Sequence, residues 1–122
     1  MTAHPVLAVH GALSRGALAV TLLVSLAVLF APGDDVPSAP PGVDKLVHLA
    51  LFAALAVSGR WAGVRAPVLA VSLGAYALLS EVVQAVTPLQ RSGSPADGLA
   101  DVLGVALGLL AWAGLSRAGT SR

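Results

Sequence analysis

Residues 80–108 read SEVVQAVTPLQRSGSPADGLADVLGVALG, and the rest of the chain is organised around this stretch. Two long apolar segments meet here across a short polar turn, and each carries an acid well inside its apolar part, Glu81 and Asp101. A charge at the centre of a bilayer costs about 2.5–3.5 kcal/mol on insertion scales, so acids within such segments usually face other protein and often mark a site. At about 1.5 Å per residue, both acids lie roughly 8–10 Å inside the same membrane face. They can therefore meet at one level.

The composition predicts an integral membrane protein. The chain has 122 residues, of which 57% are hydrophobic and 11% charged, and its mean hydropathy is +0.86. These values are far more apolar than those of an ordinary soluble domain. The net charge is only +1 and the basic residues form no cluster, which argues against nucleic acid as a partner. There are no cysteines, so disulfides, thiolate metal sites and cysteine nucleophiles are excluded.

Four apolar segments predict an all-α, four-helix membrane bundle formed by a single domain, residues 1–122. The expected spans are residues 12–31, 45–60, 66–86 and 95–115. The first is long enough to cross the hydrocarbon layer of about 30 Å. Its alternative is a signal peptide cleaved near Ala31 or Ala39, although proline follows both alanines and suits a cleavage site badly. The second segment is short, so it either relies on Lys45 and Arg60 to reach the interfaces or is shielded by neighbouring helices.

The distribution of basic residues predicts that both termini are cytoplasmic. In that orientation five arginines lie inside, and only Lys45 and Arg91 lie outside. This agrees with the excess of Lys and Arg found in cytoplasmic loops. All six acidic residues then fall in the outer half of a multi-pass protein of the cell membrane.

Small residues recur at every fourth position along one stripe of the last segment. They are Ala96, Ala100, Gly104 and Gly108. Small residues let helix backbones approach closely in lipid, so we expect this face to pack on another helix. The same stripe is a candidate surface for a homo-oligomer.

Polar residues of the second and third segments are candidates for a site. Asp44 and His48 share one helix face, although Asp44 could simply cap the helix and Lys45 could extend to the interface. His48 lies one turn into an apolar segment, where a structural histidine and a working one are equally compatible with the sequence. Gln84 stands one turn after Glu81 and could hold its carboxylate.

The turn before the last segment supplies a further cation and a further acid. Arg91 could clamp a phosphate or carboxylate, or it could neutralise Asp97 or Asp101. Asp97 also fits a capping sequence, in which Ser94 is the cap and Asp97 reaches back. Asp101 lies one turn deeper and does not fit that explanation. The candidate ligand-binding residues are therefore Asp44, Lys45, His48, Glu81, Gln84, Arg91, Asp97 and Asp101.

The order of these residues resembles the VanZ-like family of small bacterial membrane proteins. The resemblance covers about residues 44–110 and rests on Asp44-Lys45-x-x-His48, Glu81-x-x-Gln84, Pro88-x-x-Arg91, Asp97, a polar residue at 101, Gly104 and Gly108. It implies an integral membrane protein related to one associated with teicoplanin resistance, and it does not settle an activity. The family usually has Asn where this chain has Asp101. That substitution adds a potential negative charge.

If every group is ionised, the four candidate acids outnumber Lys45 and Arg91 by two. A low dielectric disfavours this excess, so either some acids stay protonated or a cation is bound. A divalent ion that bridges carboxylates and a lipid phosphate would satisfy the second alternative.

Three functions are compatible with such a site. The first is binding of a membrane lipid, or of a lipid-linked or lipid-tailed envelope molecule, at the outer leaflet. The second is an intramembrane enzyme acting on a cell-wall or lipid substrate, with His48 and Glu81 as acid and base, Arg91 stabilising developing charge and Asp101 as a further candidate. The third is a small proton-coupled transporter, although four short helices leave little room for a pathway. No nucleophile elbow, zinc motif or phosphate loop names a reaction.

Overall fold

The chain folds into four helices that lie close to the predicted segments. The computed structural model describes residues 11–30, 42–86 and 95–120. Its helices are α1 (Ala12–Phe30), α2 (Val43–Trp61), α3 (Ala66–Val86) and α4 (Pro95–Thr120). The first three begin and end within two residues of the expected positions. The fourth continues to Thr120, five residues beyond the predicted end.

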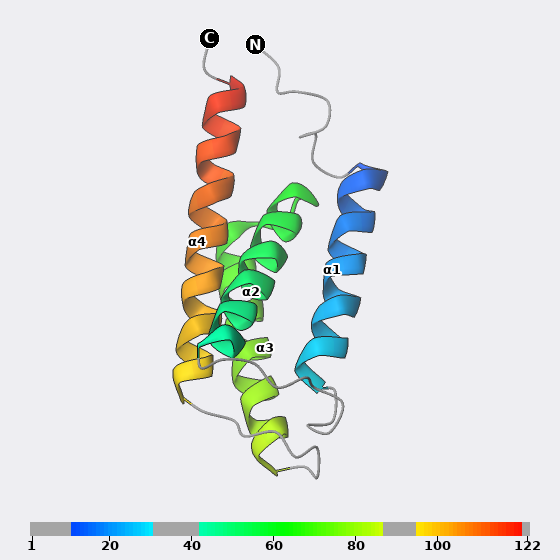
Figure 1. Cartoon of the computed structure of the whole chain (residues 1–122). Coiled ribbons are helices and arrows are strands. Elements are labelled where there is room, and N and C mark those ends of the chain that lie inside the picture. Colours follow the sequence, from blue (N-terminus) through cyan, green and yellow to red (C-terminus); the bar gives the residue numbers. More distant parts are fainter. Residues whose placement is uncertain (1–10, 31–41, 87–94, 121–122) are drawn as a thin grey trace.

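The helices alternate in direction along the chain, as Figure 1 shows. Helices α1 and α3 run one way, and α2 and α4 run the other way. The tight turn after α2 reverses the chain: Gly63 has a φ of 98°, which favours glycine, and the Val64 amide donates to the Gly59 carbonyl. As a result, the end of α1, the start of α2, the end of α3 and the start of α4 all lie at one end of the bundle. We call this the polar end, because it carries Lys45, His48, Glu81, Asp97 and Asp101.

The most extensive helix contact joins α2 and α4, and glycines make it close. A Cβ atom at Gly104 would collide with the carbonyl oxygen of Leu49. One at Gly108 would lie 2.5 Å from the carbonyl oxygen of Ala53. The expectation that this stripe packs on another helix is therefore confirmed within the chain. Helix α2 covers Gly104 and Gly108, while Ala96 at the start of the stripe is exposed, and the homo-oligomer stays a prediction.

Helix α2 supplies the centre of the core. Its Phe52, Leu55 and Ala56 are completely buried, and the Phe52 ring lies 5.5 Å from the ring of Tyr76. Helix α2 contacts each of the other three helices. The short second segment is thus shielded by its neighbours, which was one of the two alternatives for it.

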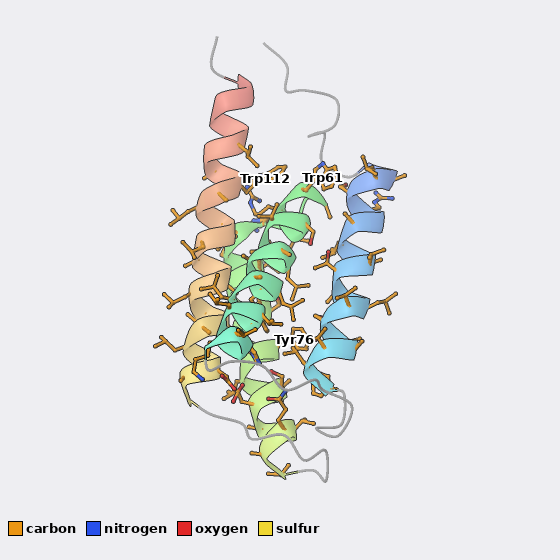
Figure 2. The ribbon with its side chains drawn as sticks, in the orientation of Figure 1. Trp61, Tyr76 and Trp112 are labelled. Carbon is orange, nitrogen blue, oxygen red and sulfur yellow. The ribbon has the colours of Figure 1, made fainter. Side chains whose placement is uncertain are left out.

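Three helical segments are long and apolar enough to cross a membrane: Ala12–Phe30, Ala66–Val86 and Ala96–Leu115. Their outer faces expose large aliphatic side chains, among them Leu23, Val71 and Leu110. Helix α2 is not among these three. The described chain is therefore an all-helical protein whose outer helices suit lipid. Figure 2 shows Trp61 and Trp112 near the end of the bundle where α2 finishes, opposite the polar end.

Candidate functional site

Three ionisable side chains from three helices converge near the polar end of the bundle. His48 of α2, Glu81 of α3 and Asp101 of α4 each place one potential ligand atom within 4.8 Å of the other two. His48 is 1% exposed and Asp101 is 0% exposed, while Glu81 is partly exposed. We call these three residues the acid–histidine cluster. The meeting of Glu81 and Asp101, expected from their depth, is found in the structure.

The parallel arrangement of α2 and α4 explains how the cluster forms. In parallel helices, successive turns of one face successive turns of the other. Lys45 faces Asp97, with Nζ 3.3 Å from Oδ1, and one turn further His48 faces Asp101, with Nδ1 2.7 Å from Oδ1. One turn after Asp101 on α4, Gly104 lies in close contact with Leu49 of α2. A single register therefore aligns both polar pairs.

The contact between His48 and Asp101 is a short, buried hydrogen bond. When Asp101 is ionised it can only accept, so the Nδ1–H of His48 donates to Oδ1. A neutral imidazole then keeps Nε2 as its basic nitrogen, while a protonated imidazole forms an ion pair. This bond fixes the orientation of the ring and makes Asp101 the immediate partner of His48. The structure thus places the Asp101 carboxylate directly beside His48.

Lys45 and Asp97 form a second pair one turn nearer to the end of the bundle. The Lys45 side chain is 49% exposed and the Asp97 side chain is 6% exposed. Asp97 lies in the first turn of α4, where the helix dipole favours a negative charge. The cation beside Asp97 in the described residues is therefore Lys45. Arg91, the other cation considered for it, lies outside the described residues, as does Ser94.

The hydrogen bond described for the Gln84 side chain joins it to α1, not to Glu81. Its side chain is buried, and Nε2 donates a hydrogen bond of 2.5 Å to the carbonyl oxygen of Leu29. Leu29 lies in the last turn of α1, where helix carbonyls lack partners within the helix. Gln84 therefore satisfies the end of α1 and ties it to α3.

The interpretation of Asp44 as the cap of α2 is wrong. The N-cap position is Gly42, with a φ of 92°, and no side chain makes a capping hydrogen bond there. Asp44 falls within the first turn of the helix instead. Its side chain lies outside the described part of the structure, so its predicted place in the site stays a prediction.

A hydrogen bond that was not predicted from the sequence joins α1 and α3. The hydroxyls of Ser25 and Tyr76 are 2.8 Å apart, and Ser25 is completely buried. Figure 2 shows Tyr76 on the side of the bundle that faces α1. A serine inside an apolar helix commonly bonds to its own backbone, as Ser25 also does to Leu22. No sequence signal therefore pointed to its partner on α3.

An apolar groove lies between α1 and α3, and none of its lining residues belongs to the acid–histidine cluster. It has a volume of about 390 Å³, and its lining includes Leu22, Leu26, Leu73 and Tyr76. Glu81 follows Tyr76 by five residues, which is about 140° around a helix of 3.6 residues per turn. Glu81 instead faces α4, since a Cβ at Gly98 would lie 3.8 Å from its Cγ. The Glu81 side chain therefore lies on the α4 side of α3 rather than in the groove.

The cluster offers two kinds of chemistry. One imidazole nitrogen and two carboxylates could hold a divalent metal ion or hydrogen-bond a polar head group. A histidine oriented by a carboxylate can also move a proton. No protein-family model matches the sequence, and neither a curated protein nor a solved structure shows significant similarity to it.

Proposed function

We propose that this chain is a multi-pass protein of the cell membrane whose acid–histidine cluster binds the polar head of a lipid-linked or lipid-tailed envelope molecule. The proposal keeps the resemblance to the VanZ-like family and places both termini in the cytoplasm. The polar end then faces the exterior. The observation that carries the proposal is the convergence of His48, Glu81 and Asp101 from three helices within a bundle that has an apolar exterior.

The surroundings of Glu81 favour a ligand with an apolar part. Glu81 is the partly exposed member of the cluster, and its neighbour Val82 is 48% exposed. On α4, Leu99 and Val102 flank Gly98 and Asp101 and are also exposed. A head group that reaches Glu81 across this rim must cross apolar surface. A molecule anchored in the bilayer would do so without leaving the lipid.

The positions of the basic residues support the proposed orientation. Arg15 lies at the start of α1, Arg60 at the end of α2 and Arg65 just before α3. All three positions belong to the end of the bundle opposite the cluster (Figure 1). The excess of Arg and Lys on cytoplasmic sides would then put the cluster near the outer leaflet. Lys45, half exposed beside the cluster, would contact an anionic head group.

Lipid analysis of the purified protein tests this function. We expect Glu81→Gln to lower the amount of the co-purifying lipid-linked molecule about tenfold, because a charge-assisted hydrogen bond contributes about 1.5–3 kcal/mol. Arg65→Gln is the control, since it removes a charge at the opposite end of the bundle. Mass spectrometry of extracts from matched amounts of folded protein gives the measurement. Unchanged lipid content in folded Glu81→Gln protein would contradict the proposal.

The family resemblance adds a cellular consequence. A contribution to teicoplanin resistance would require an intact site at the outer leaflet, where this lipoglycopeptide acts. We expect a strain that expresses the Glu81→Gln variant to lose any resistance that the wild-type chain confers. The minimum inhibitory concentration, compared at equal membrane levels of both proteins, measures this effect.

The second candidate function is acid–base catalysis on a membrane-embedded substrate. It is favoured by the 2.7 Å contact of His48 with Asp101, because a carboxylate that orients an imidazole prepares it as a base. Incubating the purified protein with extracted membrane lipids and cell-wall precursors tests this candidate. A product that disappears with Asp101→Asn, at unchanged lipid binding, would favour the enzyme. Absence of any product with the wild-type protein would remove it.

A further inference from the structure

We propose that the acid–histidine cluster binds one divalent transition-metal ion, with one nitrogen ligand from His48 and one oxygen ligand each from Glu81 and Asp101. This inference deepens the proposed function and rests on the same site. It concerns the ion that would stand between the protein and an anionic head group.

The spacing of the three side chains suits a common ion. Ligand atoms bonded to one ion at about 2.0–2.2 Å lie about 3–4 Å from one another. The three potential ligand atoms are already within 4.8 Å of each other. The remaining adjustment is small, and Glu81 can make it because its side chain is on the partly exposed side of the cluster. His48 and Asp101 are held by the closely packed α2 and α4.

The ligand types favour a transition metal over calcium or magnesium. Calcium takes six to eight oxygen ligands, and magnesium keeps most of its water shell. An imidazole nitrogen with two carboxylates is instead a set that suits zinc, manganese or ferrous iron. The histidine distinguishes this cluster from a group of acids that merely gather at a surface, and both His48 and Asp101 are almost completely buried.

The proposed ion explains how an acidic site could hold a phosphate. Two carboxylates repel an anionic head group, but a bound dication reverses the local sign of charge. Three protein ligands leave coordination positions for water or for a phosphate oxygen. If the ion binds the His48 nitrogen that now donates to Asp101, the proton of a neutral ring moves to the other nitrogen, and a protonated ring releases one proton. Because protons compete with the ion for the imidazole and the carboxylates, its binding should weaken at low pH.

Direct measurement of bound metal tests the inference on the full chain, purified without chelators and with any affinity tag removed. Elemental analysis after addition of zinc, manganese or iron, followed by gel filtration, should give about one ion per chain. The unfolding temperature, measured at increasing concentrations of that metal ion, should rise, because a ligand that binds only the folded state raises stability.

Two conservative variants and one control assign the ion to the cluster. Glu81→Gln and Asp101→Asn keep the size of each side chain, and each should weaken metal binding at least about tenfold, since even partners of ligands cost 10–100-fold when removed. Ser58→Ala is the control, because Ser58 is a buried polar residue of α2 whose hydroxyl bonds to the Leu55 carbonyl. It should bind metal as the wild type does.

The outcomes separate this inference from the proposed function. Less than one ion per ten chains with every metal, or equal affinity in the folded Glu81→Gln and Asp101→Asn variants, would overturn the metal site. Lipid content lost in Glu81→Gln from protein that never holds metal would leave the proposed function standing without the ion. Metal bound by the wild type with no lipid dependence on Glu81 would support the ion and remove the lipid function.

Discussion

The two halves of the α2–α4 interface hold the same helices together in different ways. Near the polar end, Lys45 pairs with Asp97 and His48 pairs with Asp101. Further along, Gly104 and Gly108 bring the backbones into direct contact. The polar half selects the register, because each pair forms at only one alignment. The glycine half sets the distance between the helix axes, because any side chain there would separate them.

This difference shows why a site can exist at one end of the interface. Side chains that bind a ligand must be held to within a fraction of an ångström, and rigid elements hold them best. The glycine half provides that rigidity without polar groups in its part of the interface. The polar half can then contain buried ionisable groups, even where their desolvation costs as much as their pairing contributes.

Removing His48 should have the largest effect on stability. His48→Ala leaves the Asp101 carboxylate buried beside a cavity, and breaking a buried ion pair typically costs about 3–5 kcal/mol. Unfolding in mixed micelles, followed by the fluorescence of Trp61 and Trp112, measures the change. The double variant His48→Leu, Asp101→Leu should recover much of the loss, because apolar residues of similar volume often replace a buried pair without cost. A double variant as unstable as His48→Ala would contradict this account.

Gly104→Ala breaks the other half of the interface. The new Cβ would meet the carbonyl oxygen of Leu49, and backbone cannot move aside as a flexible side chain can. We expect a loss of about 2–3 kcal/mol, toward the upper part of the range for overpacking. Gly74→Ala is the matched control, because nothing lies within 4 Å of its Cβ position. That control should leave stability unchanged or raise it slightly, since Ala favours helix more than Gly does.

The sequence predicted the helices and the convergence of the two deep acids, but not the partners of the polar residues. Apolar length and turn residues define a helix locally, and equal depth from one membrane face can be counted along the chain. The pairing of His48 with Asp101 depends on how α2 and α4 align with each other. Neither segment alone reveals that alignment. Gln84 illustrates the same point, because its partner is a backbone carbonyl of α1. The alternative in which Asp44 caps α2 fails because Gly42, in a left-handed conformation, begins α2 without a side-chain cap.

Gln84 tests whether a polar contact outside the α2–α4 interface matters less than those within it. Gln84→Leu keeps the side chain about as large but removes the hydrogen bond to Leu29 at the end of α1. We expect a loss of about 0.5–1.5 kcal/mol, the net value of a single hydrogen bond. The same micelle unfolding experiment applies, with Ser58→Ala as the control. A loss as large as that of His48→Ala would mean that α1 is as important to the polar end as α4.

Lys45→Gln should have the smallest effect on stability. It compares the two pairs of the polar half, Lys45 with Asp97 and His48 with Asp101. Its Nζ is 3.3 Å from Asp97, but the Lys45 side chain is 49% exposed, so water screens the pair. Exposed pairs contribute about 0.2–1 kcal/mol, and the first turn of α4 still favours the Asp97 charge when Lys45 is gone. If the proposed function holds, the same variant should lower the amount of anionic lipid that co-purifies, because it removes a cation beside the cluster. A loss of stability near that of His48→Ala would show that the contribution of each pair to stability does not increase with its burial. A negligible cost with lost lipid would show that Lys45 contributes to binding and that the deeper pair maintains the fold.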